Sequence, residues 1–304
     1  MINFLKKKQF NIPPEGCRPS PEDSRDVLLS SVIPEIKRYP TNSPCPFDLT
    51  ILNQNGYPHC VGYSSAALKQ EREMREKNTI IFDGDWIYKK CKELDQCPNM
   101  AGTWLRIAMK VLQKIGAKPI DKLEEEAEKY KIGSYAKVDE NTFEGLKKAI
   151  FVNGALLVGF IGSNQGWQTA YIRPPKEGET TWGHAVTLIG YNENYLIGQN
   201  SWGDWGDKGL FYVPKNYLPF EAWAILSDEP TPTGLEGWCA AEYLRTLGLV
   251  EGQQVSPTTA LKLRDKPGLN GGVIQIMIPS QKLEILKIGE SLNGFNWIRV
   301  KLIE

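Results

Sequence analysis

The chain has 304 residues, which is long enough for one large domain or for two. Hydrophobic residues make up 41% and charged residues 24%, a composition that excludes a disordered or fibrous chain. The 36 basic and 36 acidic residues balance, so we expect no nucleic-acid partner, because such proteins usually carry a basic excess. The only two histidines are His59 and His184, which excludes a three-histidine zinc site, and no metal or cofactor is expected.

Targeting and membrane-spanning segments are not evident. The lysine run at the N-terminus has no apolar stretch after it, so it does not fit a secretory signal peptide. The longest apolar run, residues 155–161, is far shorter than the roughly 20 residues that span a bilayer. We therefore expect a cytoplasmic protein without a membrane partner, with export by another route left open. The sequence indicates no oligomeric state.

The six cysteines are too few for a scaffold built on disulfides. Two local pairs, Cys17 with Cys45 and Cys91 with Cys97, are alternatives to small buried thiols. Connectivity cannot be deduced from sequence, so both alternatives stay open.

The first 45 residues are rich in proline and charge, which predicts an extended N-terminal arm. Helical patterns follow at 61–77, 103–114 and 142–152. Thr103 is predicted to cap the second of these helices, which Gly116 ends, and Gly154 to stop the third.

Short apolar runs typical of strands dominate the next part of the chain. They lie at 155–161, 185–190, 195–199, 209–213 and 222–226. Because helices come first and strands later, the sequence predicts an α+β domain with two segregated halves. The stretch 230–234 has the composition of a linker. Beyond it, the runs that suit a small β barrel are 261–264, 273–278, 282–288 and 297–302.

One cysteine lies where a thiol would be reactive. Cys60 follows a Gly/Pro turn that begins at Gln54, and it opens the first predicted helix. The positive end of a helix dipole lowers the pKa of a thiol and so favours the nucleophilic thiolate. Taken alone, a buried structural cysteine is the more common explanation.

His184 and Asn200 stand on neighbouring predicted strands. Two adjacent antiparallel strands can bring the two side chains within hydrogen-bond reach, so that the Asn200 carbonyl fixes the imidazole tautomer. Trp202 can cover that bond from water. A satisfied core histidine and a tryptophan-rich turn are the alternatives.

Together these segments resemble the papain-like cysteine peptidases. The family pattern is a Gln and a short Gly turn before a Cys at the head of a helix, then His-Ala-Val, then Asn-Ser-Trp-Gly. All of these parts occur here in that order, within about residues 15–228. The resemblance implies a two-lobed fold over residues 46–229, with a helical lobe and a β-barrel-like lobe. It makes the arm, residues 1–45, a candidate short propeptide of the kind that bacterial members carry.

The resemblance also implies a role for each motif residue. Cys60 is the nucleophile, His184 the general base and acid, and Asn200 the residue that orients the imidazole. Gln54 and the backbone N–H of Cys60 form the oxyanion hole, and acyl transfer passes through a thioester. Trp202 and Gly102 are expected in the substrate-binding cleft.

Two positions depart from the family pattern. His59 directly precedes the nucleophile, and because adjacent side chains at such a junction diverge, we expect His184 to be the base. In the segment 97–102, only Gly102 matches the Gly-Gly pair with which many members bind the substrate backbone.

Residues 230–304 resemble a bacterial SH3-like domain. The segment 261–268 resembles its start, but the terminal Gly-Trp strand occurs at 237–244, before the module rather than at its end. This order predicts a circularly permuted barrel in which residues 235–244 complete the sheet, with a linker helix over 240–247 as the alternative. Such barrels often bind cell-wall glycans or peptides, so a ligand of that kind and packing on the peptidase are both predictions.

The sequence therefore predicts a cysteine endopeptidase that acts on peptide or protein substrates. A cell-wall peptide hydrolase targeted by the SH3-like module is one alternative, and a catalytically silent binding protein on the peptidase fold is another. The complete set of Cys60, His184, Asn200 and Gln54 favours the first.

Overall fold

The structure, a computed structural model, describes residues 16–33, 38–227, 234–246, 248–259, 261–277 and 281–303. The first part of the predicted arm and most of the predicted linker lie outside these ranges. The described residues divide into two compact units. The first contains 16–20, 38–131 and 141–224, and the second contains 21–33, 132–140, 225–227 and the described residues from 234 onward.

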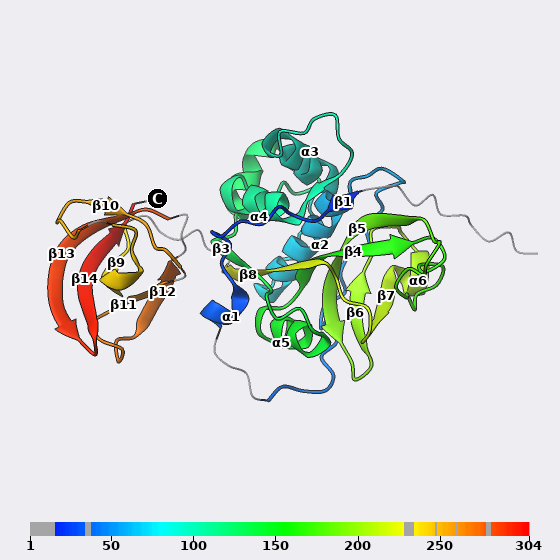
Figure 1. Cartoon of the computed structure of the whole chain (residues 1–304). Helices are drawn as coiled ribbons and strands as arrows, with labels where there is room; N and C mark the ends of the chain where they lie inside the picture. The colour runs from blue at the N-terminus through cyan, green and yellow to red at the C-terminus, as the bar shows by residue number, and fades with distance from the viewer. Residues whose placement is uncertain are drawn as a thin grey trace, which may run out of the picture. The chain divides into compact units, whose positions relative to one another are not determined.

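The helices of the first unit gather beside its sheet (Figure 1). They are α2 (Cys60–Arg75), α3 (Gly84–Leu94), α4 (Leu105–Lys114), the 3₁₀ helix η1 (Glu124–Tyr130), α5 (Phe143–Asn153) and the short α6 (Trp205–Lys208). The axes of α2 and α3 approach closely, because a Cβ on Gly62 would lie 2.2 Å from the carbonyl oxygen of Gly84. Only glycine fits at that crossing.

All three predicted helices are confirmed within two residues at each end, but the predicted cap of the second needs a correction. The helix predicted to begin at Thr103 begins at Leu105, and Thr103 is not its cap. Instead Thr103 belongs to the short strand β2 (Thr103–Trp104), since its backbone pairs with a strand of the arm. The third helix does end where expected, at Gly154, whose φ of 85° suits glycine.

The sheet of the first unit is antiparallel, with the strand order β8-β4-β5-β6-β7. Its strands are β4 (Leu156–Ser163), β5 (Thr181–Tyr191), β6 (Tyr195–Gln199), β7 (Leu210–Pro214) and β8 (Glu221–Ser227). All five match predicted strands. The central strand β5 is buried on nearly every residue, as expected for a strand covered on both faces.

The helix α2 is fastened to β5 by side-chain hydrogen bonds in both directions. The Ser64 hydroxyl donates to the Ala185 carbonyl at 2.8 Å, and the Thr187 hydroxyl donates to the Ser64 carbonyl at 2.8 Å. Because Ser64 lies one turn after Cys60, these bonds fix the N-terminal end of α2 against the strand that carries His184.

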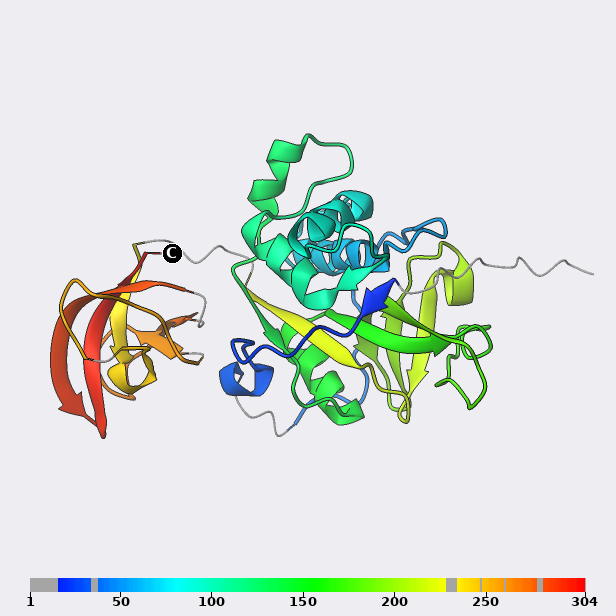
Figure 2. The same cartoon turned by 45° about the horizontal axis from the view of Figure 1, so that its top comes forward.

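The end of the predicted arm forms β1 (Cys17–Arg18), which pairs in parallel with β2. Both views show the short strand β1 lying near α2 and β5 (Figures 1 and 2). The N–H of Gly16 donates to the carbonyl of Gly183 at 3.1 Å, and the N–H of Thr103 donates to the carbonyl of Gly16 at 3.3 Å. The arm is therefore bound on both sides just where it leaves the described residues.

The second unit contains α1 (Leu29–Val32), β3 (Ser134–Lys137) and a six-stranded sheet. The order in that sheet is β10-β13-β14-β9-β11-β12. Its strands are β9 (Glu236–Ala240), β10 (Gln254–Val255), β11 (Leu261–Arg264), β12 (Val273–Met277), β13 (Leu283–Leu292) and β14 (Phe295–Leu302). A buried apolar cluster that includes Cys239, Leu263, Ile285, Ile298 and Val300 forms its core.

The strand β9 lies in the middle of this sheet, between β14 and β11. Trp238 pairs with Arg299 on one side and with Arg264 on the other. The segment predicted to complete the sheet therefore does so. A single 3₁₀ turn, Ala241–Tyr243, follows β9 where the alternative placed a longer helix.

All six cysteines lie in the described ranges and are free, so neither of the two candidate disulfides is formed. Within the same ranges, no helix has the length and apolar character needed to cross a bilayer.

Candidate active site

Cys60 is the first residue of α2 and is fully buried. Its Sγ accepts the N–H of Ala185 at 3.4 Å, so the thiol lies against the residue that follows His184 on β5. Its own backbone N–H belongs to the first turn of the helix, where no intrahelical acceptor exists. The predicted nucleophile thus has a helix N-terminus on one side and the histidine strand on the other.

His184 and Asn200 are brought together as predicted. His184 lies on β5 and Asn200 directly follows β6, and the Nε2 of His184 lies 2.8 Å from the Oδ1 of Asn200. The same oxygen accepts the N–H of Ser201 at 2.8 Å, which holds the amide in place. With Nε2 engaged by Asn200, Nδ1 is the ring nitrogen left for a proton-transfer partner.

Tryptophans enclose the imidazole. The ring of Trp202 lies 4.6 Å from that of His184, and those of Trp167 and Trp182 stand edge-on to it at 5.7 and 5.9 Å. Burial lowers the pKa of His184 to about 4, against the hydrogen bond that the ring makes to the Asn200 oxygen, which raises it. In this enclosure the histidine is neutral at pH 7.

The arm covers the thiol. A Cβ built on Gly16 would lie 2.5 Å from the Sγ of Cys60, so the arm backbone is in direct contact with the sulfur. Burial raises the pKa of Cys60 to about 12, although N–H groups of Ala185 and Val61 lower it. The covered site is therefore a neutral thiol beside a neutral imidazole.

Gln54 is buried next to this pair. Its Nε2 donates to the Tyr57 carbonyl at 2.6 Å, and its Oε1 accepts the Ser201 hydroxyl at 2.6 Å. An amide nitrogen has two donors, and one of them is used here. The residue is thus tied to the neighbour of Asn200 and keeps one N–H for a further acceptor.

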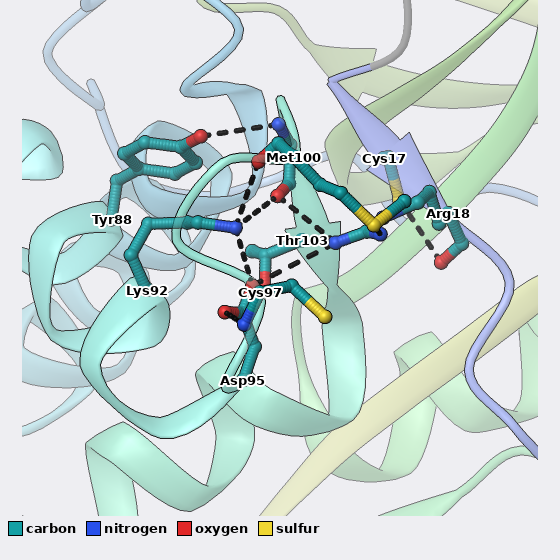
Figure 3. A network of polar contacts seen from close by, with 9 residues as sticks. Cys17, Arg18, Tyr88, Lys92, Asp95, Cys97, Met100 and Thr103 are labelled. Atoms are coloured by element: carbon teal, nitrogen blue, oxygen red, sulfur yellow. Dashed lines mark hydrogen bonds and ion pairs between the residues drawn. The ribbon is translucent and has the colours of Figure 1, made fainter.

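The two predicted cleft residues have different surroundings. Trp202 stacks on His184 as described, whereas both backbone groups of Gly102 are engaged within the protein. Its N–H donates to the Tyr88 hydroxyl at 3.1 Å, and its carbonyl accepts from Lys92 at 3.1 Å and from Arg18 at 3.3 Å. Figure 3 shows this network around β1 and β2.

His59 is held away from the thiol by its own contacts. Its Nδ1 lies 2.7 Å from Asp85 Oδ1, and its ring stacks on Tyr88 at 4.0 Å. The two histidines therefore occupy separate environments, one enclosed with Asn200 and one at the surface with a carboxylate.

Four residues of this region are not predicted from the sequence, namely Arg18, Tyr88, Lys92 and Asp95. Two of them lie on α3, which was not predicted. The signal was present, because Asp83 caps α3 by accepting the N–H of Trp86 at 3.0 Å, and an apolar stripe follows.

Within the described part of the chain, no group of three or more His, Cys, Asp and Glu residues is arranged to hold a metal ion.

Residues 88–222 match a family model whose description is papain family cysteine protease. The matched stretch contains His184 and Asn200 and begins after Gln54 and Cys60. Among curated proteins, none has a sequence that matches this chain.

Solved structures of cysteine proteases have a similar fold. Xylellain, from Xylella fastidiosa, is 22% identical with a TM-score of 0.63, and the similarity covers 75% of this chain and 100% of xylellain. Procathepsin L2 of Tenebrio molitor is 16% identical with a TM-score of 0.56, covering 74% of this chain and 82% of that one. The Carica candamarcensis protease CMS1MS2, in complex with E-64, is 16% identical with a TM-score of 0.50, covering 63% and 100%. At these identities the similarity concerns the fold.

Proposed function

We propose that this chain is a hydrolase of the papain-family cysteine protease type that cleaves peptide bonds through Cys60 and His184. The observation that carries the proposal is the joint placement of the two side chains. The thiol accepts the N–H of Ala185 at 3.4 Å, and Asn200 engages the far nitrogen of the His184 ring at 2.8 Å. A silent binding protein would not need this set.

In the first half of the reaction, Nδ1 of His184 takes the thiol proton and Sγ attacks the carbonyl carbon of the peptide bond. The oxygen becomes an oxyanion, stabilised by the N–H of Cys60 and the unused N–H of Gln54. When the C–N bond breaks, His184 gives its proton to the leaving amine, and the acyl group stays on sulfur as a thioester.

In the second half, His184 takes a proton from water while the water oxygen attacks the thioester carbon. The C–S bond then breaks, the product leaves as a carboxylic acid, and the thiol regains its proton. Asn200 holds the imidazole in one orientation through both halves, and Trp202 excludes water from their hydrogen bond.

The arm around Gly16 acts as a short propeptide in this proposal. Its contact with the sulfur of Cys60 blocks attack on any carbonyl, and burial keeps the thiol and imidazole neutral. The hydrolase becomes active when this segment leaves the nucleophile.

The test is cleavage of a peptide library under reducing conditions, followed by mass spectrometry. The full chain and a Gly16→Ala chain, in which the added methyl displaces the arm, are compared with Cys60→Ala. Cleavage by the Gly16→Ala chain and none by Cys60→Ala support the proposal, and internal cleavage of the peptides identifies an endopeptidase. Cys97→Ser, which alters another free thiol, is the matched control. If folded Gly16→Ala protein shows neither cleavage of peptides nor covalent labelling by E-64, the proposal is rejected.

For the second unit, we propose a circularly permuted SH3-like barrel. The central place of β9 supports it, because a strand that precedes the rest of the module lies where a terminal strand would be expected. Tyr243 and Phe295, with ring centroids 6.0 Å apart, offer an aromatic surface for a cell-wall glycan or peptide. The ligand is tested by co-sedimentation of the full chain with cell-wall peptidoglycan, which should be weaker for Tyr243→Ala. If neither chain sediments with peptidoglycan, the cell-wall ligand is rejected.

A further inference from the structure

The side chain of Arg18 lies in a cradle formed by Met100, Gly102, Trp104 and Asp95. Figure 3 shows Arg18 beside Met100 and Asp95. Its guanidinium carbon lies 4.3 Å from the centre of the Trp104 ring. One terminal nitrogen donates to the Gly102 carbonyl at 3.3 Å and lies 3.7 Å from Asp95 Oδ2. The other lies 3.2 Å from the Met100 sulfur. The guanidinium thus has a π face on one side and acceptors around its edge.

The backbone register connects this cradle to the nucleophile. Gly16 touches the sulfur of Cys60, and Arg18, two residues later, pairs with Trp104 on β2. An extended peptide that binds beside β2 with one residue at Cys60 therefore places the side chain of a nearby residue in the cradle that Arg18 occupies. A substrate therefore replaces the arm in the cradle as well as at the thiol.

The cradle is rigid because hydrogen bonds from neighbouring residues hold the Asp95 carboxylate in place. The Asp95 carboxylate accepts Lys92 Nζ at 2.7 Å, the Thr103 hydroxyl at 2.9 Å and the N–H of Cys97 at 2.9 Å. Burial alone would raise the pKa of Asp95, but the hydrogen bonds from Lys92, Cys97 and Thr103 hold it below its usual value. The carboxylate is therefore ionised at pH 7.

The neighbouring lysine does not make the cradle a site for acids. Lys92 donates to Asp95, to the Met100 carbonyl at 2.9 Å and to the Gly102 carbonyl at 3.1 Å. These three acceptors match the three donors of an ammonium group. What faces an incoming side chain is an aromatic face, carbonyl and carboxylate oxygens and a thioether, and a planar cation with several donors satisfies all of them.

We propose that this cradle is a subsite for an arginine side chain of the substrate, and that Arg18 is its internal occupant. The substrate class is then peptides with arginine at one fixed position within three residues of the cleaved bond. The inference rests on the proposed peptidase function and adds selectivity to it.

The experiment uses the full chain carrying Arg18→Ala, which empties the cradle. Peptides with arginine are compared with peptides in which citrulline, of similar shape but uncharged, replaces it. We expect kcat/KM to be on the order of tenfold higher for arginine at one position. Adding Trp104→Leu should remove most of that ratio. Tyr171→Leu, which alters an exposed aromatic residue that lines no part of this cradle, should leave the ratio intact.

Equal cleavage of the arginine and citrulline peptides at every position would overturn the subsite while leaving the peptidase function in place. If no peptide is cleaved, the peptidase function fails, and the subsite is tested by protection. Arginine peptides should then slow alkylation of Cys60 by iodoacetamide more than citrulline peptides do, and equal protection overturns the inference.

Discussion

The hydroxyl of Ser64 donates to the carbonyl of Ala185 at 2.8 Å, while the thiol one turn earlier accepts the N–H of the same residue at 3.4 Å. Residues four apart lie on one face of a helix, so Cys60 and Ser64 both reach the strand from the same side. These two hydrogen bonds fix the position of the helix that carries the proposed nucleophile relative to the strand that carries His184. Ser64 has no part in the proposed chemistry, yet its hydrogen bond holds the end of α2 that carries Cys60 against the strand that carries His184.

Replacing Ser64 with alanine should lower both stability and turnover. The change removes a buried hydrogen bond, which costs about 1–3 kcal/mol of unfolding free energy. It also frees the end of α2, so kcat should fall while KM changes little. Ser65→Ala is the matched control, because that hydroxyl donates within its own helix, to the Val61 carbonyl. Equal falls in kcat for both variants would contradict the registering role.

A methyl group at Gly16 should uncover the thiol. Because an added Cβ would lie 2.5 Å from the sulfur of Cys60, Gly16→Ala must shift the arm. We expect faster alkylation of Cys60 by iodoacetamide at pH 7 and higher peptidase activity than in the unaltered chain. Gly248→Ala, where an added Cβ meets nothing within 4 Å, should change neither. Unchanged alkylation in Gly16→Ala would mean that the arm does not limit access.

Acid should destabilise the first unit through His184. Its pKa is about 4 in the folded chain and about 6.5 when unfolded, so below pH 6.5 the unfolded chain binds a proton that the folded chain does not. The free energy of unfolding should therefore fall between pH 6.5 and 4, by up to about 3 kcal/mol. Urea unfolding at pH 7 and pH 4.5 measures the fall. His184→Gln should show a smaller fall in the free energy of unfolding. An equal fall in both chains would show that protonation of His184 is not its cause.

The two histidines should respond differently to substitution. His59→Gln should leave kcat/KM within a few-fold, since His59 bonds Asp85 and stacks on Tyr88 rather than facing the thiol. His184→Gln should lower it by about 10³-fold or more, because no group then takes the thiol proton. Peptide hydrolysis by both variants decides between them. A larger loss in His59→Gln would reverse the assignment of the base.

The sequence predicted the elements whose residues alternate or repeat with a clear period. The strand at Tyr195–Gln199 is recovered to the residue, and α5 ends at the predicted glycine because a positive φ is required there. The helix α3 was missed, although Asp83 caps it. The sequence pattern predicts a cap at Thr103, but its backbone pairs with the arm instead, a contact that depends on residues far away in the chain.

The candidate site likewise has parts that local sequence motifs predict and parts that only distant contacts create. Cys60, Gln54, His184 and Asn200 lie in motifs, and the last two are joined by a hydrogen bond. The cradle of Arg18 has no motif, since its lining lies in residues 95–104 and its occupant lies in the arm, two segments that meet only in the fold. Nor could a sequence pattern indicate that Tyr88 already occupies the N–H of Gly102.

The position of β9 bears on how the second unit is made and how it can be shortened. Trp297 pairs with Ala240, so one side of β9 finds its partner only in β14, which is synthesised after the other five strands of this sheet. Until then β9 presents an open edge, and contacts this distant in sequence form slowly. Deleting residues 295–303 would therefore split the sheet at its centre and leave an aggregation-prone product.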